Sequence, residues 1–193
     1  MNKTITLSLF TYIFFIIIST GLAFFSFEGY SILSNTTSHL GAQGSPHSWL
    51  MNIIFIALGA TTIWVTCQSK IRYHQIIGAA FGLSLIMTAF FHHAPLIDAV
   101  QTDPFQDGVH SFFANATGFS FTLLAMGHGF ISCGMQRYVA FGMAAVAIII
   151  SIGMMAFPDI MGLLQRIMFL SAFGWLFFYM KPPENKQVGS RPD

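Results

Sequence analysis

A carboxylate and an imidazole stand three residues apart at Asp107 and His110. Residues with this spacing share a helix face, so the carboxylate could orient the imidazole for acid–base chemistry or metal binding. Ser111 and Asn115 continue the polar face inward. We therefore predict His110 as a general base or metal ligand, Asp107 as its orienting carboxylate, and Asn115 as a ligand-binding residue. For Asp107 alone, a helix N-cap is the simpler interpretation, because a carboxylate suits a helix start and its dipole.

One basic residue, Arg166, lies about six residues inside an apolar stretch, or about 9 Å along a helix. A charged arginine in a bilayer costs roughly a few kcal/mol or more unless it is paired or hydrated. We expect it to pair with an outer acid, above all Asp107, with Asp159 or Glu28 as alternatives. The pair would form a buried latch between helices, whereas a free guanidinium would anchor an anionic substrate group. Both interpretations stay open, so Arg166 is a candidate catalytic and ligand-binding residue.

Histidines concentrate toward one end of the predicted bundle and could supply ligands to a divalent metal such as zinc. The candidate metal ligands are His39, His92, His93 and His110. Their spacing matches no recognised zinc signature, so solvated interfacial histidines are the alternative. His128 lies 18 residues beyond His110, about 27 Å along a helix, and cannot join them. We expect His128 to pack between helices, bonded to a backbone group or hydroxyl, with no histidine partner at its depth.

The segment 34–47 is rich in turn-forming and small polar residues. Its backbone amides could bind a phosphate or cover a cavity, and we predict Ser38 within it as a ligand-binding residue. A plain surface loop is the alternative.

The composition sets the environment in which these residues act. The chain has 193 residues, of which 54% are hydrophobic and only 8% are charged, and its mean hydropathy is +0.67. Soluble domains carry about 25% charged residues, so most of this surface must face lipid. The net charge of +1 argues against nucleic acid as a partner. Membrane lipids and an anionic or amphiphilic small molecule are the expected partners, and the oligomeric state stays open.

Six segments approach the roughly 20 apolar residues that a membrane-spanning helix needs. They are 5–27, 49–67, 76–91, 110–132, 138–157 and 161–180. We predict an all-α polytopic bundle of six transmembrane helices over residues 1–181, and a short flexible cytoplasmic tail at 182–193. Gly78 and Gly82 in the third span allow close helix approach.

The basic residues orient this bundle. If the helices alternate in direction, seven of the eight Lys and Arg residues fall on one side, and Arg166 is the exception. The opposite loops, 28–48, 92–109 and 158–160, contain no Lys or Arg. The positive-inside rule then places both termini in the cytoplasm. The candidate site would face the outside, or the periplasm if the membrane is a bacterial inner membrane.

Several short motifs carry a family resemblance. They are Ser38-His39-Leu40-Gly41-Ala42, Gly44-Ser45-Pro46 with Asn52, Asp107-Gly108-Val109-His110-Ser111, and Gly162-Leu163-Leu164-Gln165-Arg166 with Trp175. Together they resemble a bacterial and archaeal membrane family catalogued as domain of unknown function 998. The resemblance spans nearly the whole chain and implies six helices and an outer cluster of Asn52, His110 and Arg166, with Asn52 as a ligand-binding residue. It implies no activity. This chain departs from the family's usual Pro–acidic turn with Phe91-His92-His93-Ala94-Pro95.

Three functions remain open. A membrane-embedded hydrolase or transferase, metal-dependent or not, would act on a lipid or amphiphile, with Arg166 as electrostatic anchor. A small transporter or receptor would bind an anionic ligand, although the two halves show no convincing repeat and no proline interrupts a span deeply. A structural or accessory protein would use the polar residues only as a buried latch. An enzyme should bring His110 and Arg166 to one space at the outer face.

Overall fold

The computed structural model describes residues 3–97 and 99–181, and within these ranges it contains helices and no strands. The long helices are α1 (Lys3–Gly21), α3 (Ser48–Gln68), α4 (Arg72–Phe90), α5 (Pro104–Ile131), α6 (Gly134–Ala156) and α7 (Met161–Gly174). The short ones are η1 (Leu22–Phe25), α2 (Thr37–Leu40), η2 (Pro158–Ile160) and the π-helical η3 (Trp175–Tyr179). The predicted tail at 182–193 lies outside the described residues.

Five helical stretches are long and apolar enough to cross a membrane. They are Lys3–Phe25, Ser48–Gln68, Arg72–Phe90, Gly134–Ala156 and Pro158–Tyr179. This chain is therefore a multi-pass membrane protein. The predicted fourth span lies in α5, which has 28 residues but does not belong to this apolar set. Polar side chains in its first half, from Gln106 to Asn115, lower its hydropathy.

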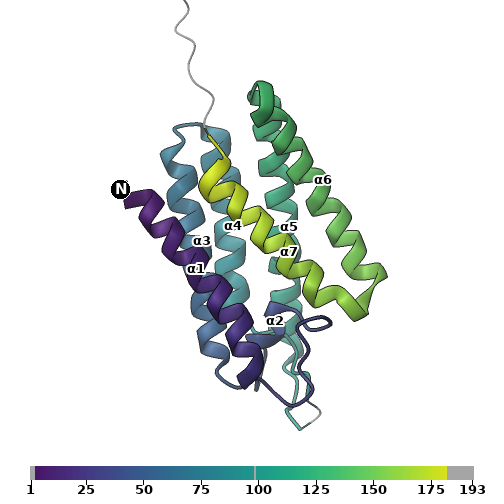
Figure 1. The fold of residues 1–193 in the computed structure, drawn as a ribbon. Helices are drawn as coiled ribbons and strands as arrows, with labels where there is room; N and C mark the ends of the chain where they lie inside the picture. Colours follow the sequence, from purple (N-terminus) through teal and green to yellow (C-terminus); the bar gives the residue numbers. More distant parts are fainter. Residues whose placement is uncertain (1–2, 98, 182–193) are drawn as a thin grey trace, which may run out of the picture.

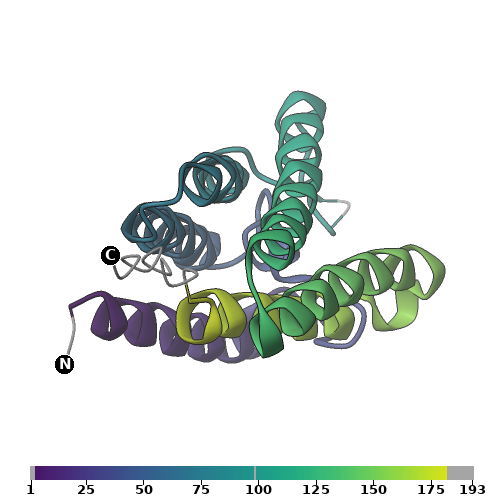
Figure 2. The ribbon, with the colours of Figure 1, turned by 90° about the horizontal axis from the view of Figure 1, so that it is seen from above.

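The helices form a closed ring of contacts. In chain order α1 packs on α3, α3 on α4, α4 on α5, α5 on α6 and α6 on α7, and η3 returns to α1. Figures 1 and 2 show two layers, with α3, α4 and α5 in one and α1, α7 and α6 in the other. Toward the turn that joins α6 to α7, both helices diverge from α5 (Figure 1). We call the end formed by residues 22–47, 91–103 and 157–160 the loop end, and the end at 69–71 and 132–133 the opposite end.

Glycine lets two helices of the first layer approach closely. A Cβ atom added to Gly59 of α3 would lie 2.4 Å from the Gly82 carbonyl oxygen, and one added to Gly82 of α4 would lie 2.5 Å from the Gly59 oxygen. A Cβ at Gly78 would likewise meet the Thr66 side chain. The prediction of close helix approach at Gly78 and Gly82 is confirmed.

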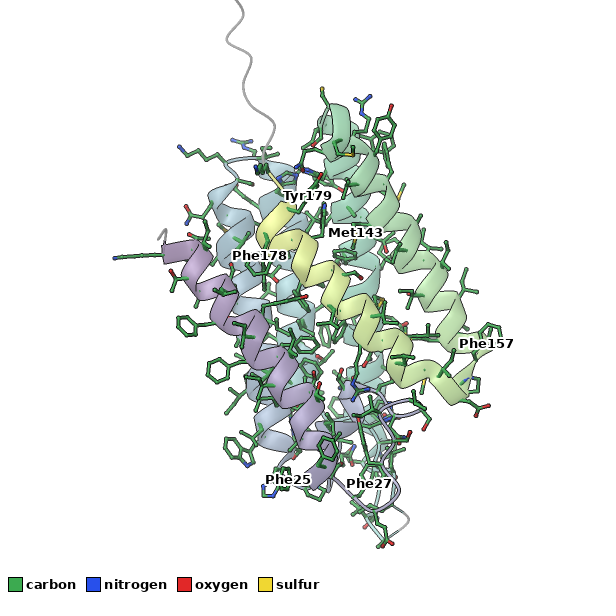
Figure 3. All side chains as sticks on the ribbon, in the orientation of Figure 1. Phe25, Phe27, Met143, Phe157, Phe178 and Tyr179 are labelled. Atoms are coloured by element: carbon green, nitrogen blue, oxygen red, sulfur yellow. The ribbon has the colours of Figure 1, made fainter. Side chains whose placement is uncertain are left out.

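Aromatic rings fill the space between the layers. Phe81 stacks on Phe173 with ring centroids 5.8 Å apart, and Phe121 meets Trp175 edge-on at 5.9 Å. Other large apolar side chains point outward, as Phe25 and Phe157 do in Figure 3. Such an outer surface is suited to lipid rather than water.

Candidate functional site

A cavity of about 800 Å³ lies where α6 and α7 diverge from α5, with α3 and α4 behind it. Most of its wall is apolar and comes from Phe, Leu, Ile and Met side chains. Polar side chains line it toward the loop end, namely Thr36, Ser38, His39, His93, His110, Ser111, Asn115 and Gln165. Among the described residues, no Asp, Glu, Lys or Arg lines the cavity. The arrangement suits a molecule with an apolar body and a polar end.

Gly118 of α5 helps keep this space open. It lines the cavity, and a Cβ atom added to it would meet nothing within 4 Å. A larger side chain at this position would therefore enter the cavity instead of displacing a neighbour.

Three imidazoles from three different segments meet at the polar end. The ring centroids of His39, in α2, and His93, in the α4–α5 connection, are 4.9 Å apart. Those of His93 and His110, in α5, are 5.3 Å apart. We call His39, His93 and His110 the imidazole cluster. The sequence nominated all three residues, and the structure brings them together.

Hydrogen bonds set which nitrogen of each ring is protonated. His110 Nδ1 lies 3.0 Å from the Thr88 carbonyl oxygen and 2.8 Å from that of Phe91. Because carbonyl oxygens only accept, Nδ1 is the donor, and Nε2 of the neutral ring keeps its lone pair. This Nε2 is buried and has no hydrogen-bond partner among the described residues. A buried basic nitrogen of this kind can receive a proton or a donor from a bound molecule.

His39 has the opposite tautomer, with its proton on Nε2. Its Nδ1 accepts a hydrogen bond from the backbone N–H of Thr36 at 3.0 Å, so Nε2 of the neutral ring carries the proton. Burial, followed by positive charge on His93, His110 and Arg166, lowers the pKa of His39 to about 4. His39 is therefore a neutral N–H donor at pH 7.

Asp107 does not orient His110 as predicted. Its Oδ1 accepts a hydrogen bond from the Ala94 N–H at 2.8 Å and lies 3.6 Å from His93 Nδ1. Both residues lie in α5, but His110 Nδ1 is held by the carbonyl oxygens of Thr88 and Phe91, and Asp107 holds the α4–α5 connection instead. Nor is Asp107 the helix cap, because Asp103 is the N-cap of α5 and accepts from the N–H groups of Phe105 and Gln106. Asp107 sits in the first turn and supports the imidazole cluster through His93.

The predicted ion pair of Arg166 is wrong. Its Nη1 donates to the carbonyl oxygens of Ile32, Asn35 and Gly162 at 2.8–3.1 Å. Its Nη2 donates to the Ser19 carbonyl and, at 2.7 Å, to the Tyr30 hydroxyl. The only ion pair within the described ranges joins His93 and Asp107, so neither Asp107, Asp159 nor Glu28 neutralises this guanidinium.

The first turns of α7 hold the segment 30–37 in place. Gln165 Oε1 accepts from both the backbone N–H and the hydroxyl of Thr37, at 2.8 and 2.7 Å. A Cβ at Gly162 would lie 2.2 Å from the Asn35 carbonyl oxygen, so only glycine fits there. Arg166 is itself only 7% exposed and does not line the cavity. Its hydrogen bonds position the segment that carries Ser38 and His39.

The fourth candidate metal ligand is engaged elsewhere. Asn52 Nδ2 lies 3.2 Å from His92 Nε2 and donates to the Gly41 carbonyl oxygen at 3.3 Å. Within the described part of the chain, no three His, Cys, Asp or Glu side chains are arranged to hold a metal ion. The geometry therefore lends no support to a zinc site at His39, His92, His93 and His110.

The other nominated residues divide between cavity and scaffold. Ser38 and Asn115 line the cavity, and Asn115 Nδ2 donates to the Ser111 carbonyl oxygen at 2.8 Å. Asn52, His110 and Arg166, the cluster that the resemblance implied, lie at the same end, but no hydrogen bond in the described ranges joins any two of them. Thr36 and Gln165 were not predicted from the sequence. Both line the cavity and hydrogen-bond to His39 and Thr37, respectively, through contacts that residue spacing does not indicate.

Residues 11–180 match the family described as "Protein of unknown function (DUF998)". The chain belongs to the DUF998 family. This confirms the resemblance seen in the sequence. Searches of curated proteins and of solved structures find no match to this DUF998 protein.

The DUF998 chain also pairs two histidines at its opposite end. His128 Nδ1 lies 3.2 Å from His74 Nε2, and His128 Nε2 lies 3.1 Å from the Ser132 hydroxyl oxygen. The predicted bond to a hydroxyl is confirmed. The prediction that His128 has no histidine partner is wrong, because α4 begins at Arg72 and so includes His74.

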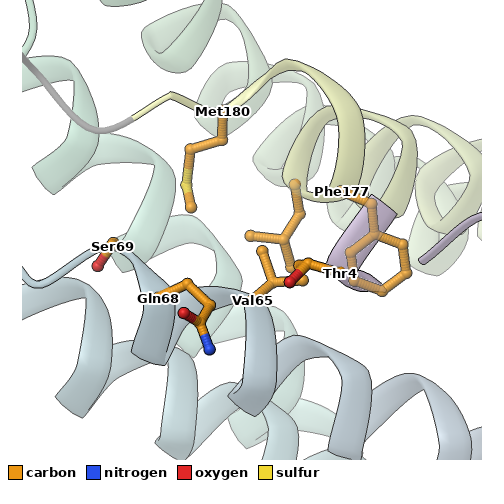
Figure 4. A pocket seen from close by; sticks show the side chains of 7 residues that line it. Thr4, Val65, Gln68, Ser69, Phe177 and Met180 are labelled. Atoms are coloured by element: carbon orange, nitrogen blue, oxygen red, sulfur yellow. The ribbon is translucent and has the colours of Figure 1, made fainter. Parts of the chain in front are cut away.

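A second, smaller cavity of about 270 Å³ lies near this end (Figure 4). Its lining is uncharged and consists of Thr4, Val65, Gln68, Ser69, Leu176, Phe177 and Met180. It offers no group for acid–base chemistry. The imidazole-lined cavity is therefore the candidate functional site.

Proposed function

We propose that all six long helices cross the membrane, with the loop end outside and both termini in the cytoplasm. α4 ends at the loop end and α6 begins at the opposite end, and both are apolar enough to span. Because α5 connects them and packs along both, it must traverse the same thickness. At 1.5 Å per residue its 28 residues extend about 42 Å, more than the roughly 30 Å of a bilayer core.

The orientation follows from the basic residues. Lys70, Arg72 and Arg137 lie at or beside the opposite end, whereas the loop-end segments hold no Lys or Arg. The positive-inside rule assigns the opposite end to the cytoplasm. The imidazole cluster then lies toward the outer leaflet.

Within this membrane protein, the geometry best supports binding of a lipid-like amphiphile. The observation that carries this proposal is a single cavity with long apolar walls and the imidazole cluster at one end. Its volume of about 800 Å³ falls within the roughly 300–1,000 Å³ of typical ligand sites. The apolar chain would lie against α5, α6 and α7, and the polar group would meet His39 and His110.

The polar end must decide the affinity. An amphiphile that leaves the bilayer for this cavity exchanges one apolar environment for another, so its chain gains little from the hydrophobic effect. Buried N–H groups and lone pairs without partners gain much more from a matching headgroup. Selection by headgroup is therefore the expected behaviour.

The test fills the cavity and compares the result with a matched change on the lipid face. Gly118→Phe should place a ring in the cavity, whereas Gly142→Phe adds the same ring on an exposed α6 position where a Cβ also meets nothing within 4 Å. Wild-type protein and Gly142→Phe, reconstituted in nanodiscs, should crosslink to a photoactivatable lipid at cavity residues. Gly118→Phe should lose at least tenfold of that crosslinking. Equal crosslinking in both variants would remove the basis for the proposal.

Hydrolysis of the bound amphiphile is a second candidate, favoured by one observation. His110 lines the cavity, its buried Nε2 has a lone pair without a partner in the described ranges, and two backbone carbonyls hold its ring through Nδ1. Such a nitrogen could act as general base toward a water beside an ester. His110→Asn keeps a donor toward those carbonyls and removes the base. In an enzyme the variant should still crosslink to lipid but lose turnover of a fluorogenic ester, whereas a binding protein shows no turnover in either form.

A further inference from the structure

We propose that the headgroup bound at the imidazole cluster is an anionic phosphate. This inference rests on the proposed amphiphile binding and names the chemical class of the ligand. Its physical basis is a buried positive charge without a counter-ion, next to a cavity end that offers hydrogen-bond donors and has no carboxylate among its described lining residues; the Asp107 carboxylate lies behind this lining, 3.6 Å from His93 Nδ1.

The buried charge belongs to Arg166. Five oxygens accept from its Nη atoms, and all five are neutral carbonyls or a hydroxyl. Its Nε is buried and has no partner within the described ranges. Neutral dipoles satisfy N–H groups, but they leave the net charge in place. A negative charge nearby would therefore be stabilised.

The field of this charge reaches the cavity. Arg166 follows Gln165, which lines the cavity, and its guanidinium bonds the carbonyl of Asn35 beside Thr36, which also lines it. Arg166 is one of the charges that lower the pKa of His39. No acid among the described lining residues opposes this field.

Donors at the polar end suit phosphate oxygens. His39 carries its proton on Nε2, because Nδ1 accepts from the Thr36 N–H. The side-chain Oε1 of Gln165 already accepts two hydrogen bonds from Thr37. The side-chain NH₂ group of this cavity-lining residue is therefore the part that can donate to a ligand. The hydroxyl of Ser38 also lines this end.

Acceptors also line this end, and they narrow the class of headgroup further. His93 Nδ1 lies 3.1 Å from the Ala94 carbonyl oxygen and donates to it, so Nε2 of the neutral His93 ring keeps its lone pair, as Nε2 of His110 does. The lone pair of His110 Nε2 would repel a bare phosphate oxygen but would accept from a hydroxyl. A headgroup that carries both a phosphate anion and a hydroxyl offers partners to donors and to acceptors at this end. Phosphatidylglycerol is a simple probe with this composition, and phosphatidylcholine lacks both the net charge and the hydroxyl.

The experiment changes the charge of the cavity while keeping its shape. Gln165→Glu retains an oxygen for Thr37 and places a carboxylate beside the polar end. Gln68→Glu makes the same charge change at an exposed position of α3 at the opposite end. Native mass spectrometry in detergent would measure the relative binding of phosphatidylglycerol and phosphatidylcholine to each protein, and thermal unfolding would confirm that each is folded.

Wild-type protein and Gln68→Glu should prefer phosphatidylglycerol by at least tenfold, and Gln165→Glu should reduce that ratio to near one. Equal binding of the two lipids by the wild type, still lost in Gly118→Phe, would overturn the anionic headgroup and leave amphiphile binding intact. No cavity-dependent binding of either lipid would overturn both. Displacement of the lipid by inorganic phosphate at constant ionic strength would identify a soluble anion as the ligand and also overturn this inference.

Discussion

Acid should destabilise this protein through His39 in particular. The imidazole is 6% exposed, and burial lowers its pKa from 6.5 to about 4. In the unfolded chain His39 therefore binds a proton below pH 6.5, whereas in the folded chain it does so only below about pH 4. Stability is unaffected by His39 above about pH 7.5, falls as the pH drops through 6.5, and levels off below 4. At pH 4.5 the loss amounts to about 2.5 kcal/mol, taking about 1.36 kcal/mol per pKa unit.

His39→Gln isolates this contribution. In α2 the Thr36 hydroxyl accepts from the backbone at position 39, and the His39 side chain accepts from the Thr36 N–H. Glutamine at this third helical position makes the same reciprocal cap, so the variant keeps the local structure and cannot titrate. His47→Asn is the control, because His47 is exposed and its φ of 54° suits asparagine.

The assay is the free energy of unfolding from SDS titration at pH 8, 6.5, 5.5 and 4.5. Other titrating groups contribute to all three proteins and cancel in the differences. Between pH 8 and pH 4.5, the free energy of unfolding of His39→Gln should rise by about 2.5 kcal/mol relative to that of the wild type. The difference between His47→Asn and the wild type should stay constant over this range. A constant difference between His39→Gln and the wild type across this range would refute the buried, neutral state of His39.

Three further predictions follow from the fold and from Arg166. Alkaline phosphatase fused after Lys181 should be inactive in cells, since that end is assigned to the cytoplasm; strong activity would reverse the topology. Arg166→Leu should cost about 3 kcal/mol or more of stability, because five oxygens lose their donor. Asp107→Asn should neither rescue nor add to that loss beyond its own effect, and a coupling above about 1 kcal/mol in the double-mutant cycle would reveal a pair. Gly162→Ala should cost about 1–3 kcal/mol by overpacking, measured against a neutral Gly142→Ala.

Hydropathy alone located the helices well, and it erred where polar residues serve the site. Five predicted spans correspond to the five apolar helical stretches within a few residues. The start of α5 was placed at His110 instead of Pro104, because the first two turns are polar. A local signal was present, since Asp103 followed by Pro104 is the preferred N-cap with proline at the first helical position. That signal identifies Asp103, and not Asp107, as the N-cap.

The imidazole cluster could be nominated from the sequence but not assembled. The cluster comes from three separate segments, which contribute His39, His93 and His110. Their packing depends on the contact of the Asn52 side chain with Gly41 and on the hydrogen bond from the Ala94 N–H to Asp107. The tautomers depend on backbone carbonyls at the end of α4 and on the cap of α2. Such tertiary hydrogen bonds have no counterpart in residue spacing.

The ion pair predicted for Arg166 rested on the charge of the guanidinium alone and left out the hydrogen bonds that the surrounding backbone requires. An acid is the expected partner of a buried guanidinium, and the sequence offers three. The segment 30–37, however, is irregular backbone packed within a membrane protein, and its carbonyl oxygens are not satisfied by a helical ladder of their own. Arg166 satisfies those oxygens from α7. A buried arginine can therefore be held by hydrogen bonds to the carbonyl oxygens of a loop instead of by a distant carboxylate.

The contacts of Arg166 match neither the ion-pair latch nor the free anchor that the sequence left open. Three of the five hydrogen bonds hold segment 30–37, and the other two reach the carbonyl oxygens of Ser19 and Gly162, so the side chain ties the segment to α1 and α7 without an ion pair. Because every acceptor is neutral, those contacts do not cancel its charge. In the proposed function, the same residue thus shapes the cavity through its hydrogen bonds and favours an anion through its field. Replacement by lysine would keep the charge but lose most of the five bonds, whereas Gln165→Glu would oppose the charge and leave the bonds in place. The two variants therefore separate the two contributions, and lipid preference should follow the charge while stability follows the bonds.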